Sequence, residues 1–513
     1  MEMRLVKEAL RLEQPVGTTR ATSTVTGEVT LPGGLREETH VLSAQALASV
    51  DSADAAAGRI NVRGRVAFRV LYTQGDPEKV QSLEATADFM QPCELTGVQS
   101  RAAVQAWAQT ERVQARAIGG RLSLSAEVEI TAYASSLAPV EAVTAIEGAD
   151  QVQVLSREQS VCRMVAAGSR EVLLREELPL PDGLQIRDTL SATAYPVLEA
   201  VTGGVGRAGL SGQVLLEAVH ASTLPGRPLT VTRHSFPFAQ SVEMAGEDGE
   251  TLDGAVTVKD VAVALQEDEA GRQSLRAEVL LGLEAHAEVQ ETLSVMLDAY
   301  TTGGEDVQMT HQTLQCRTGG GRVCAAESAR VTLQLPQSAP PVRTLLAAFA
   351  HPALSRVECS AGRANLSGTL DTTLLYMTDG SSAPVSFRLS EPFRVSFAAE
   401  ITPEDVITLE ATEAEAVPIT SDRIELRCVM RMQAMTQRSV PLTLISEGQN
   451  VPGREITEDI VLCYVQPDES LWDIARRYRI PQEQLRTLNP EMGAQVQPGQ
   501  GILVWRRSAG VAG

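Results

Sequence analysis

The sequence predicts a mainly β protein with three tandem antiparallel β domains, each a sandwich or a partly open barrel, followed by a small β-α-α-β domain. Three observations support this prediction. A glycine motif recurs at domain-sized intervals, apolar residues alternate with polar ones after it, and helical periodicity begins only near the C-terminus. A length of 513 residues suits three to four domains of about 150 residues.

The glycine motif has the form Gly-Arg-x-x-(Val/Leu)-x-Gly. It reads GRINVRG at residues 58–64, GRAGLSG at 206–212 and GRANLSG at 362–368. Solenoid repeats recur every 20 to 50 residues, so these much longer intervals indicate whole domains in tandem.

Strand patterns follow each copy of the motif. In residues 65–72 the side chains alternate with the period of two that is typical of a half-buried β-strand. Tyr72, His220 and Tyr376 occupy the same position after the motif, which predicts a packing role for His220. Short strands separated by Gly, Pro and Asp clusters favour antiparallel sheets. Gly319, Gly320 and Gly321 are predicted to form a flexible hairpin turn.

These patterns divide the chain into predicted segments. Residues 1–150, 151–305 and 306–445 form the three β domains, 446–459 a linker, and 460–506 the small domain. The linker is rich in Gly, Pro and charge, which predicts that the small domain moves independently.

Charge and leader patterns limit the possible partners and compartment. The net charge is −21, but five acidic residues and six arginines give the part from Val461 onward a charge of +1, leaving −22 elsewhere. Such acidity disfavours nucleic acid as a partner. Neither a signal-like apolar run at the N-terminus nor about 18 consecutive apolar residues occurs, which predicts a cytosolic protein without a transmembrane segment. Seven scattered cysteines predict reduced thiols.

The C-terminal domain has strong local signals. Ser470 is a good helix N-cap, with Asp473 three residues on in a capping-box arrangement. An apolar face at helical spacing follows, consisting of Leu471, Ile474, Ala475 and Tyr478. Pro481 begins a second helix, and the dipeptide at 489–490 ends it. A final strand is predicted at residues 502–504.

This arrangement across residues 464–505 resembles a LysM domain. The resemblance implies binding of N-acetylglucosamine glycans such as peptidoglycan, in a groove between the loops at 467–472 and 489–496. The residues carried over as partner- or glycan-binding are Pro467, Asp468, Glu469, Ser470, Leu471, Trp472, Asn489, Pro490 and Met492. The first loop departs from the family's usual Gly-Asp-Thr, and the loss of Gly removes a residue that readily adopts positive φ. A protein partner is therefore favoured over glycan, and both stay open.

The preceding repeats, together with LDAYTTG at residues 297–303, resemble SPOCS domains of spore-forming Firmicutes. Three such modules before one LysM domain is the layout of SipL-like spore coat morphogenesis proteins. The resemblance implies a mother-cell adaptor at the forespore surface, in which the LysM domain binds the coat-basement ATPase and helps to anchor the coat. The alternative is a cell-wall protein that binds peptidoglycan.

The sequence predicts neither catalysis nor a bound cofactor or metal. No nucleophile elbow, phosphate-binding loop, HExxH helix or zinc-type spacing is present in it. For Trp472 an exposed partner contact and a core position are equally expected, whereas for Trp505 a core position is favoured.

Overall fold

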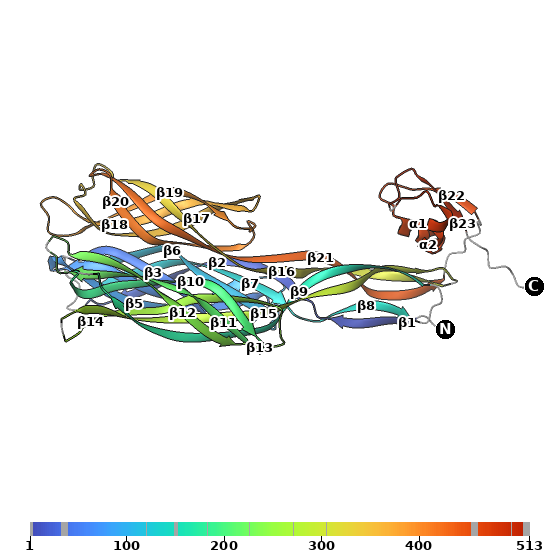
Figure 1. Ribbon diagram of the computed structural model, residues 1–513, viewed down its shortest axis with the longest axis horizontal. Helices are drawn as coiled ribbons and strands as arrows, with labels where there is room; N and C mark the ends of the chain where they lie inside the picture. The colour runs from blue at the N-terminus through green and yellow to red at the C-terminus, as the bar shows by residue number, and fades with distance from the viewer. Residues whose placement is uncertain are drawn as a thin grey trace, which may run out of the picture.

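The computed structural model describes residues 4–31, 39–118, 121–147, 152–181, 183–224, 226–269, 271–303, 305–452, 460–493 and 495–505. It is elongated, with a thick body of β modules at one end and narrow ribbons leading to a small helical domain at the other (Figure 1). The predicted mainly β architecture with antiparallel sheets is confirmed.

The first module is a sandwich of two three-stranded antiparallel sheets. One sheet has the order β3 (His40–Ala56), β4 (Arg59–Gln74), β5 (Asp76–Glu94), and the other β2 (Gln14–Val29), β7 (Arg121–Ser136), β6 (Ala103–Ile118). Alternate side chains of both sheets enter one core, which includes Val66, Phe68, Leu122 and Leu124. The choice between sandwich and barrel, left open by the sequence, is decided by this two-sheet pairing.

The second and third modules repeat this topology. In the second, β10 (Ile186–Gly204), β11 (Arg207–Ser222) and β12 (Leu229–Glu243) face the sheet of β13 (Ala245–Gly246), β9 (Val152–Pro179), β15 (Gln273–Thr301) and β14 (Thr251–Glu267). In the third, β17 (Thr344–Ser360), β18 (Arg363–Met377) and β19 (Val385–Ala398) face β16 (Glu305–Gln334), β21 (Arg423–Pro452) and β20 (Val406–Pro418).

Equivalent residues of the three modules meet in one shared apolar cluster. Leu42, Leu190 and Leu346, from the equivalent strands β3, β10 and β17, pack together. At the opposite end the outer parts of β9–β15 and β16–β21 run as long ribbons beside the pair β1 (Arg4–Leu10) and β8 (Val140–Glu147) (Figure 1). The ribbons share an apolar seam to which each contributes, so they form one stalk.

The recurring glycine motif has a geometric cause. Its first glycine opens a tight turn with positive φ, as at Gly58, where φ is 74°. Its second glycine faces the neighbouring strand beside a β-bulge. A Cβ on Gly212 would lie 2.0 Å from the carbonyl oxygen of Val197, and one on Gly368 would lie 1.9 Å from that of Ala353.

His220, at the position of Tyr72 and Tyr376, is fully buried in the second module. Its ring nitrogens form hydrogen bonds with the hydroxyls of Thr189 (3.1 Å) and Thr232 (2.8 Å). Burial, with a smaller contribution from the neighbouring His234, lowers the pKa of His220 to about 4. The side chain therefore packs as a neutral ring, as the repeat predicts.

A buried ion cluster ties the N-terminal segment to the second and third modules. Arg317 donates to Glu13 at 3.3 Å and to Glu288, and all three side chains are at most 6% exposed. Although burial opposes ionisation, hydrogen bonds from His286 and the Arg317 charge hold the pKa of Glu288 at about 2.

Two expectations about local structure are wrong. Gly319, Gly320 and Gly321 do not form a hairpin turn but continue β16, where a Cβ on Gly320 would strike the Thr436 carbonyl oxygen at 2.3 Å. Residues 446–452, expected in the linker, continue β21 and pair with β16, because the ribbon extends beyond the sandwich core. The remaining linker residues, 453–459, lie outside the described part of the chain.

Candidate functional site

The C-terminal domain has the predicted β-α-α-β order. It consists of β22 (Ile460–Tyr464), α1 (Leu471–Tyr478), α2 (Gln482–Leu488) and β23 (Gly501–Trp505), with the two strands paired antiparallel. The predicted capping box is present: the Ser470 hydroxyl accepts from the Asp473 amide at 3.2 Å, and the Asp473 carboxylate accepts from the Ser470 amide at 2.9 Å. Helix α1 buries Leu471, Ile474 and Ala475 in a small core.

Most of the first candidate loop is exposed at the surface. Pro467, Asp468 and Ser470 are exposed, whereas the Glu469 side chain is 6% exposed and forms an ion pair with Arg477. Asp468 has φ of 65°, so it adopts the positive φ expected of the Gly that it replaces. The substitution therefore keeps the backbone geometry and adds a negative charge.

The second candidate loop is hydrogen-bonded to β23. The Asn489 side chain donates to the Leu503 carbonyl at 2.8 Å and accepts from the Leu503 amide at 2.7 Å, which makes it a structural residue. Pro490 is exposed, and Met492 is half-buried against the core cluster that also contains Leu471 and Trp472. Parts of both loops therefore meet at one core.

Trp472 contacts the stalk. Its indole nitrogen donates to the Asp298 carboxylate at 2.8 Å, and its ring meets that of Tyr300 edge-on, with centroids 4.9 Å apart. Arg476 pairs with the same Asp298 oxygen, and the Tyr300 hydroxyl donates to the Ile480 carbonyl at 2.7 Å. Trp472 is 7% exposed and Tyr300 0%, so both rings are removed from water.

Arg479 completes this contact. It ends α1 in the left-handed region, with φ of 53°, and is 5% exposed. Its guanidinium donates to the Thr301 carbonyl at 3.0 Å and to the Thr301 hydroxyl at 2.7 Å. We name the set of Asp298, Tyr300 and Thr301 with Trp472, Arg476 and Arg479 the clasp.

The clasp was missed from the sequence, where residues 297–303 served only as a marker of the repeat. It also disagrees with the expected independent movement of the C-terminal domain, because a buried aromatic pair and charged hydrogen bonds join that domain to β15. The available signal in the sequence was the acidic and aromatic pair Asp298 and Tyr300, which the arginines of the distant helix α1 could contact.

Trp505 differs from the expectation of a core position. It is 42% exposed, because alternation along β23 directs Ile502 and Val504 inward and Trp505 outward.

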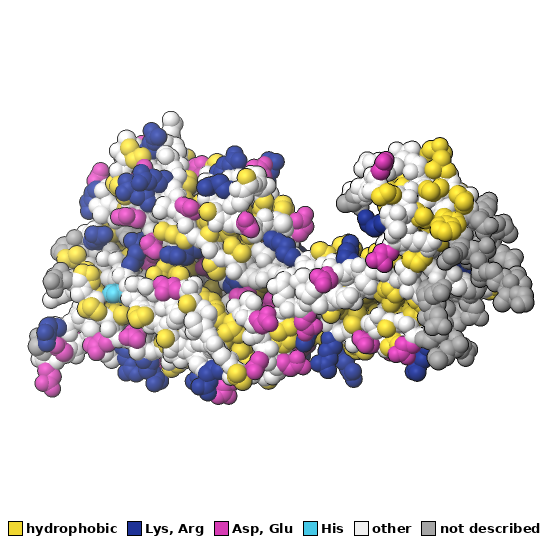
Figure 2. Space-filling model, turned by 45° about the vertical axis from the view of Figure 1, so that its right-hand side comes forward, with side chains coloured by type: hydrophobic (Ala, Val, Ile, Leu, Met, Phe, Trp, Pro, Cys, Tyr) yellow, Lys and Arg dark blue, Asp and Glu magenta, His cyan; other side chains and the backbone are white. Residues whose placement is uncertain are grey.

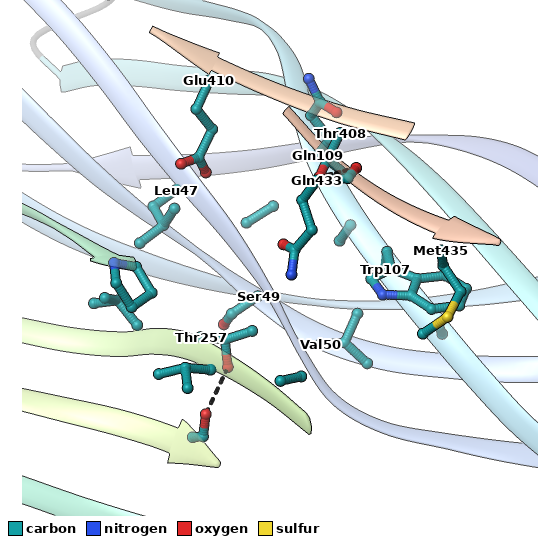
Figure 3. A pocket seen from close by; sticks show the side chains of 18 of the residues that line it. Leu47, Ser49, Val50, Trp107, Gln109, Thr257, Thr408, Glu410, Gln433 and Met435 are labelled. Carbon is teal, nitrogen blue, oxygen red and sulfur yellow. Dashed lines mark hydrogen bonds between the residues drawn. The ribbon is translucent and has the colours of Figure 1, made fainter. Parts of the chain in front are cut away.

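A cavity of about 1160 Å³ lies between the three modules. Its lining mixes apolar side chains such as Leu47 and Trp107 with polar ones such as Gln109, Gln433 and Glu410 (Figure 3). Glu410 faces this cavity, and its partial desolvation there raises the pKa of its carboxyl group. Over the residues whose structure is described, no group of three or more His, Cys, Asp or Glu side chains could hold a metal ion. No described helix has the length and hydropathy needed to cross a membrane.

The fold and this site define a protein of tandem β-sandwich modules that carries a LysM-type domain at the end of a stalk. Comparison with family models found the SipL SPOCS domain at residues 39–118 and the LysM domain at residues 463–505. The chain therefore contains one segment similar to the SipL SPOCS domain and a C-terminal segment similar to the LysM domain. Comparisons with curated proteins and with solved structures found no match.

Proposed function

We propose that this chain is a non-enzymatic adaptor of endospore formation. It works in the mother cell at the forespore surface, where its LysM domain binds the coat-basement ATPase and anchors the coat. The observation that carries the proposal is the clasp, which holds the LysM domain at the end of the stalk, remote from the three-module body (Figure 1). This arrangement suits a protein that binds one partner through its LysM domain and another through its three-module body, and holds the two apart.

The loop surface supports a protein partner. Pro467, Asp468 and Pro490 are exposed and offer no aromatic platform on which a sugar ring could stack, because Trp472 is engaged in the clasp. The alternative function, binding of N-acetylglucosamine glycans, is favoured by one observation: Asp468 keeps the positive φ of the family's glycine.

Titration of the full chain with the purified coat-basement ATPase tests the proposal. The double variant Pro467→Lys and Pro490→Lys changes only exposed loop residues and should weaken binding at least tenfold. Pro498→Lys, exposed in the turn before β23, is the matched control and should bind as the original chain does.

Titration with an N-acetylglucosamine tetramer forms the second arm. The adaptor proposal is wrong, and the glycan function holds, if the original chain binds the tetramer but not the ATPase and the loop variant no longer binds the tetramer. A Trp472→Ala variant is unsuitable here, since it would also break the clasp.

A further inference from the structure

The outward face of the LysM sheet is a continuous apolar patch. Alternate residues of β22 and β23 point away from the core. Ile460, Leu462, Tyr464, Leu503 and Trp505 are 69%, 57%, 58%, 39% and 42% exposed, respectively. Figure 2 shows a corresponding concentration of hydrophobic side chains on this domain. We name these five residues the sheet patch.

The strand register makes the patch contiguous. Ile460 pairs with Trp505 and Leu462 with Leu503, so these side chains are cross-strand neighbours on one face. Exposed alternate positions of the two strands bear no charge, and together the five side chains present on the order of 500 Å² to solvent. Patches of this size on soluble proteins mark interaction sites.

The clasp and the patch involve different side chains of the domain. The clasp uses α1 and the residue that ends it, whereas the patch consists only of outward residues of the sheet. Formation of the clasp therefore leaves the patch exposed, as the fractional exposures record.

Three properties point to a second copy of this chain as the occupant. A face without charge can meet its own twofold mate without burying an unpaired ion. Two such faces would bury about 1,000 Å², near the lower limit of specific interfaces. Residues 460–505 hold five acidic residues and four arginines, so the tip is nearly neutral in a chain of net charge −21. Contact at the tips keeps the acidic bodies apart.

We propose that the chain self-associates through the sheet patch, forming a twofold dimer joined at its LysM domains. The small area predicts a micromolar dissociation constant rather than a nanomolar one. A dimer presents two sets of LysM loops and two three-module bodies, which strengthens attachment to any repeating surface through effective concentration.

Sedimentation velocity of the full chain between about 1 and 200 µM tests this proposal. The original chain should change from monomer to dimer over that range. Leu462→Glu should weaken dimerisation at least tenfold, because it places one unpaired carboxylate from each copy in the apolar contact. Ile460→Glu, at the most exposed patch position, provides a second variant.

Met90→Glu is the matched control, since Met90 on β5 is 67% exposed in the first module, outside the LysM domain. It should dimerise as the original chain does. A chain that stays monomeric at 200 µM overturns the proposal, as does equal dimerisation of all variants. Loss of ATPase binding in Leu462→Glu, with the original chain monomeric, would instead assign the patch to that partner.

Discussion

The clasp makes a quantitative prediction at Asp298. One oxygen of this carboxylate accepts from the Trp472 indole and pairs with Arg476, while the Asp298 side chain is 13% exposed. Hydrogen bonds to charged groups contribute about 1.5–3 kcal/mol each. The Arg476 pair is discounted because that side chain is 39% exposed. Asp298→Ala should therefore cost about 3 kcal/mol of docking free energy, or about 100-fold in the docking equilibrium.

Hydrogen exchange of the segment 471–480 in the full chain measures this change. Undocking returns Trp472 and Arg479 to water, so amides in that segment should exchange faster in Asp298→Ala. Tyr300→Phe, which removes only the hydroxyl donor to Ile480, should have a smaller effect of about 1 kcal/mol.

Glu284→Ala is the control, because it removes an exposed carboxylate elsewhere on β15. The segment should then keep its original exchange rate. Unchanged exchange in Asp298→Ala would refute the reasoning, because it would mean that the clasp contributes nothing to holding the LysM domain.

Further predictions concern the modules. Gly212→Ala should lower the free energy of unfolding by about 1–3 kcal/mol in urea titrations, whereas Gly204→Ala, where a Cβ meets nothing within 4 Å, should change it by less than about 1 kcal/mol. His220 has a folded pKa of about 4 against 6.5, so its contribution is complete above pH 6.5 and is lost as pH falls toward 4. His220→Gln should abolish about 3 kcal/mol of that pH dependence, measured by unfolding at successive pH values. Glu288, with a folded pKa of about 2 against 4.5, contributes fully above pH 4.5 and loses that contribution as pH falls toward 2, so Glu288→Gln should remove this acid-side loss of stability.

Local patterns in the sequence were sufficient for much of the fold. Alternation after the glycine motif located the central strands, and the capping box at Ser470 located α1. These features depend on interactions within a few residues, or on a face whose period is set by backbone geometry. His220 was also interpretable, because its repeat position is that of a buried tyrosine.

The pairing of strands that are distant in the sequence could not be predicted from the sequence alone. The three glycines at 319–321 have the composition of a turn, but β21 supplies a continuous partner strand and so keeps them extended. The same pairing extends the ribbon through residue 452. Amino-acid composition indicates the local conformational freedom of the backbone, whereas a strand forms only where a partner strand satisfies its hydrogen bonds.

The sequence by itself determined that the chain is modular and mainly β, that its modules share one motif, and that a LysM domain follows them. Only the tertiary structure decided which LysM residues face outward. Asp298 and Tyr300 lie more than 170 residues before Trp472 and nevertheless bury it, while β23 turns Trp505 to solvent. Local periodicity records which side of an element is apolar, but the burial of that side depends on the distant surface that packs against it.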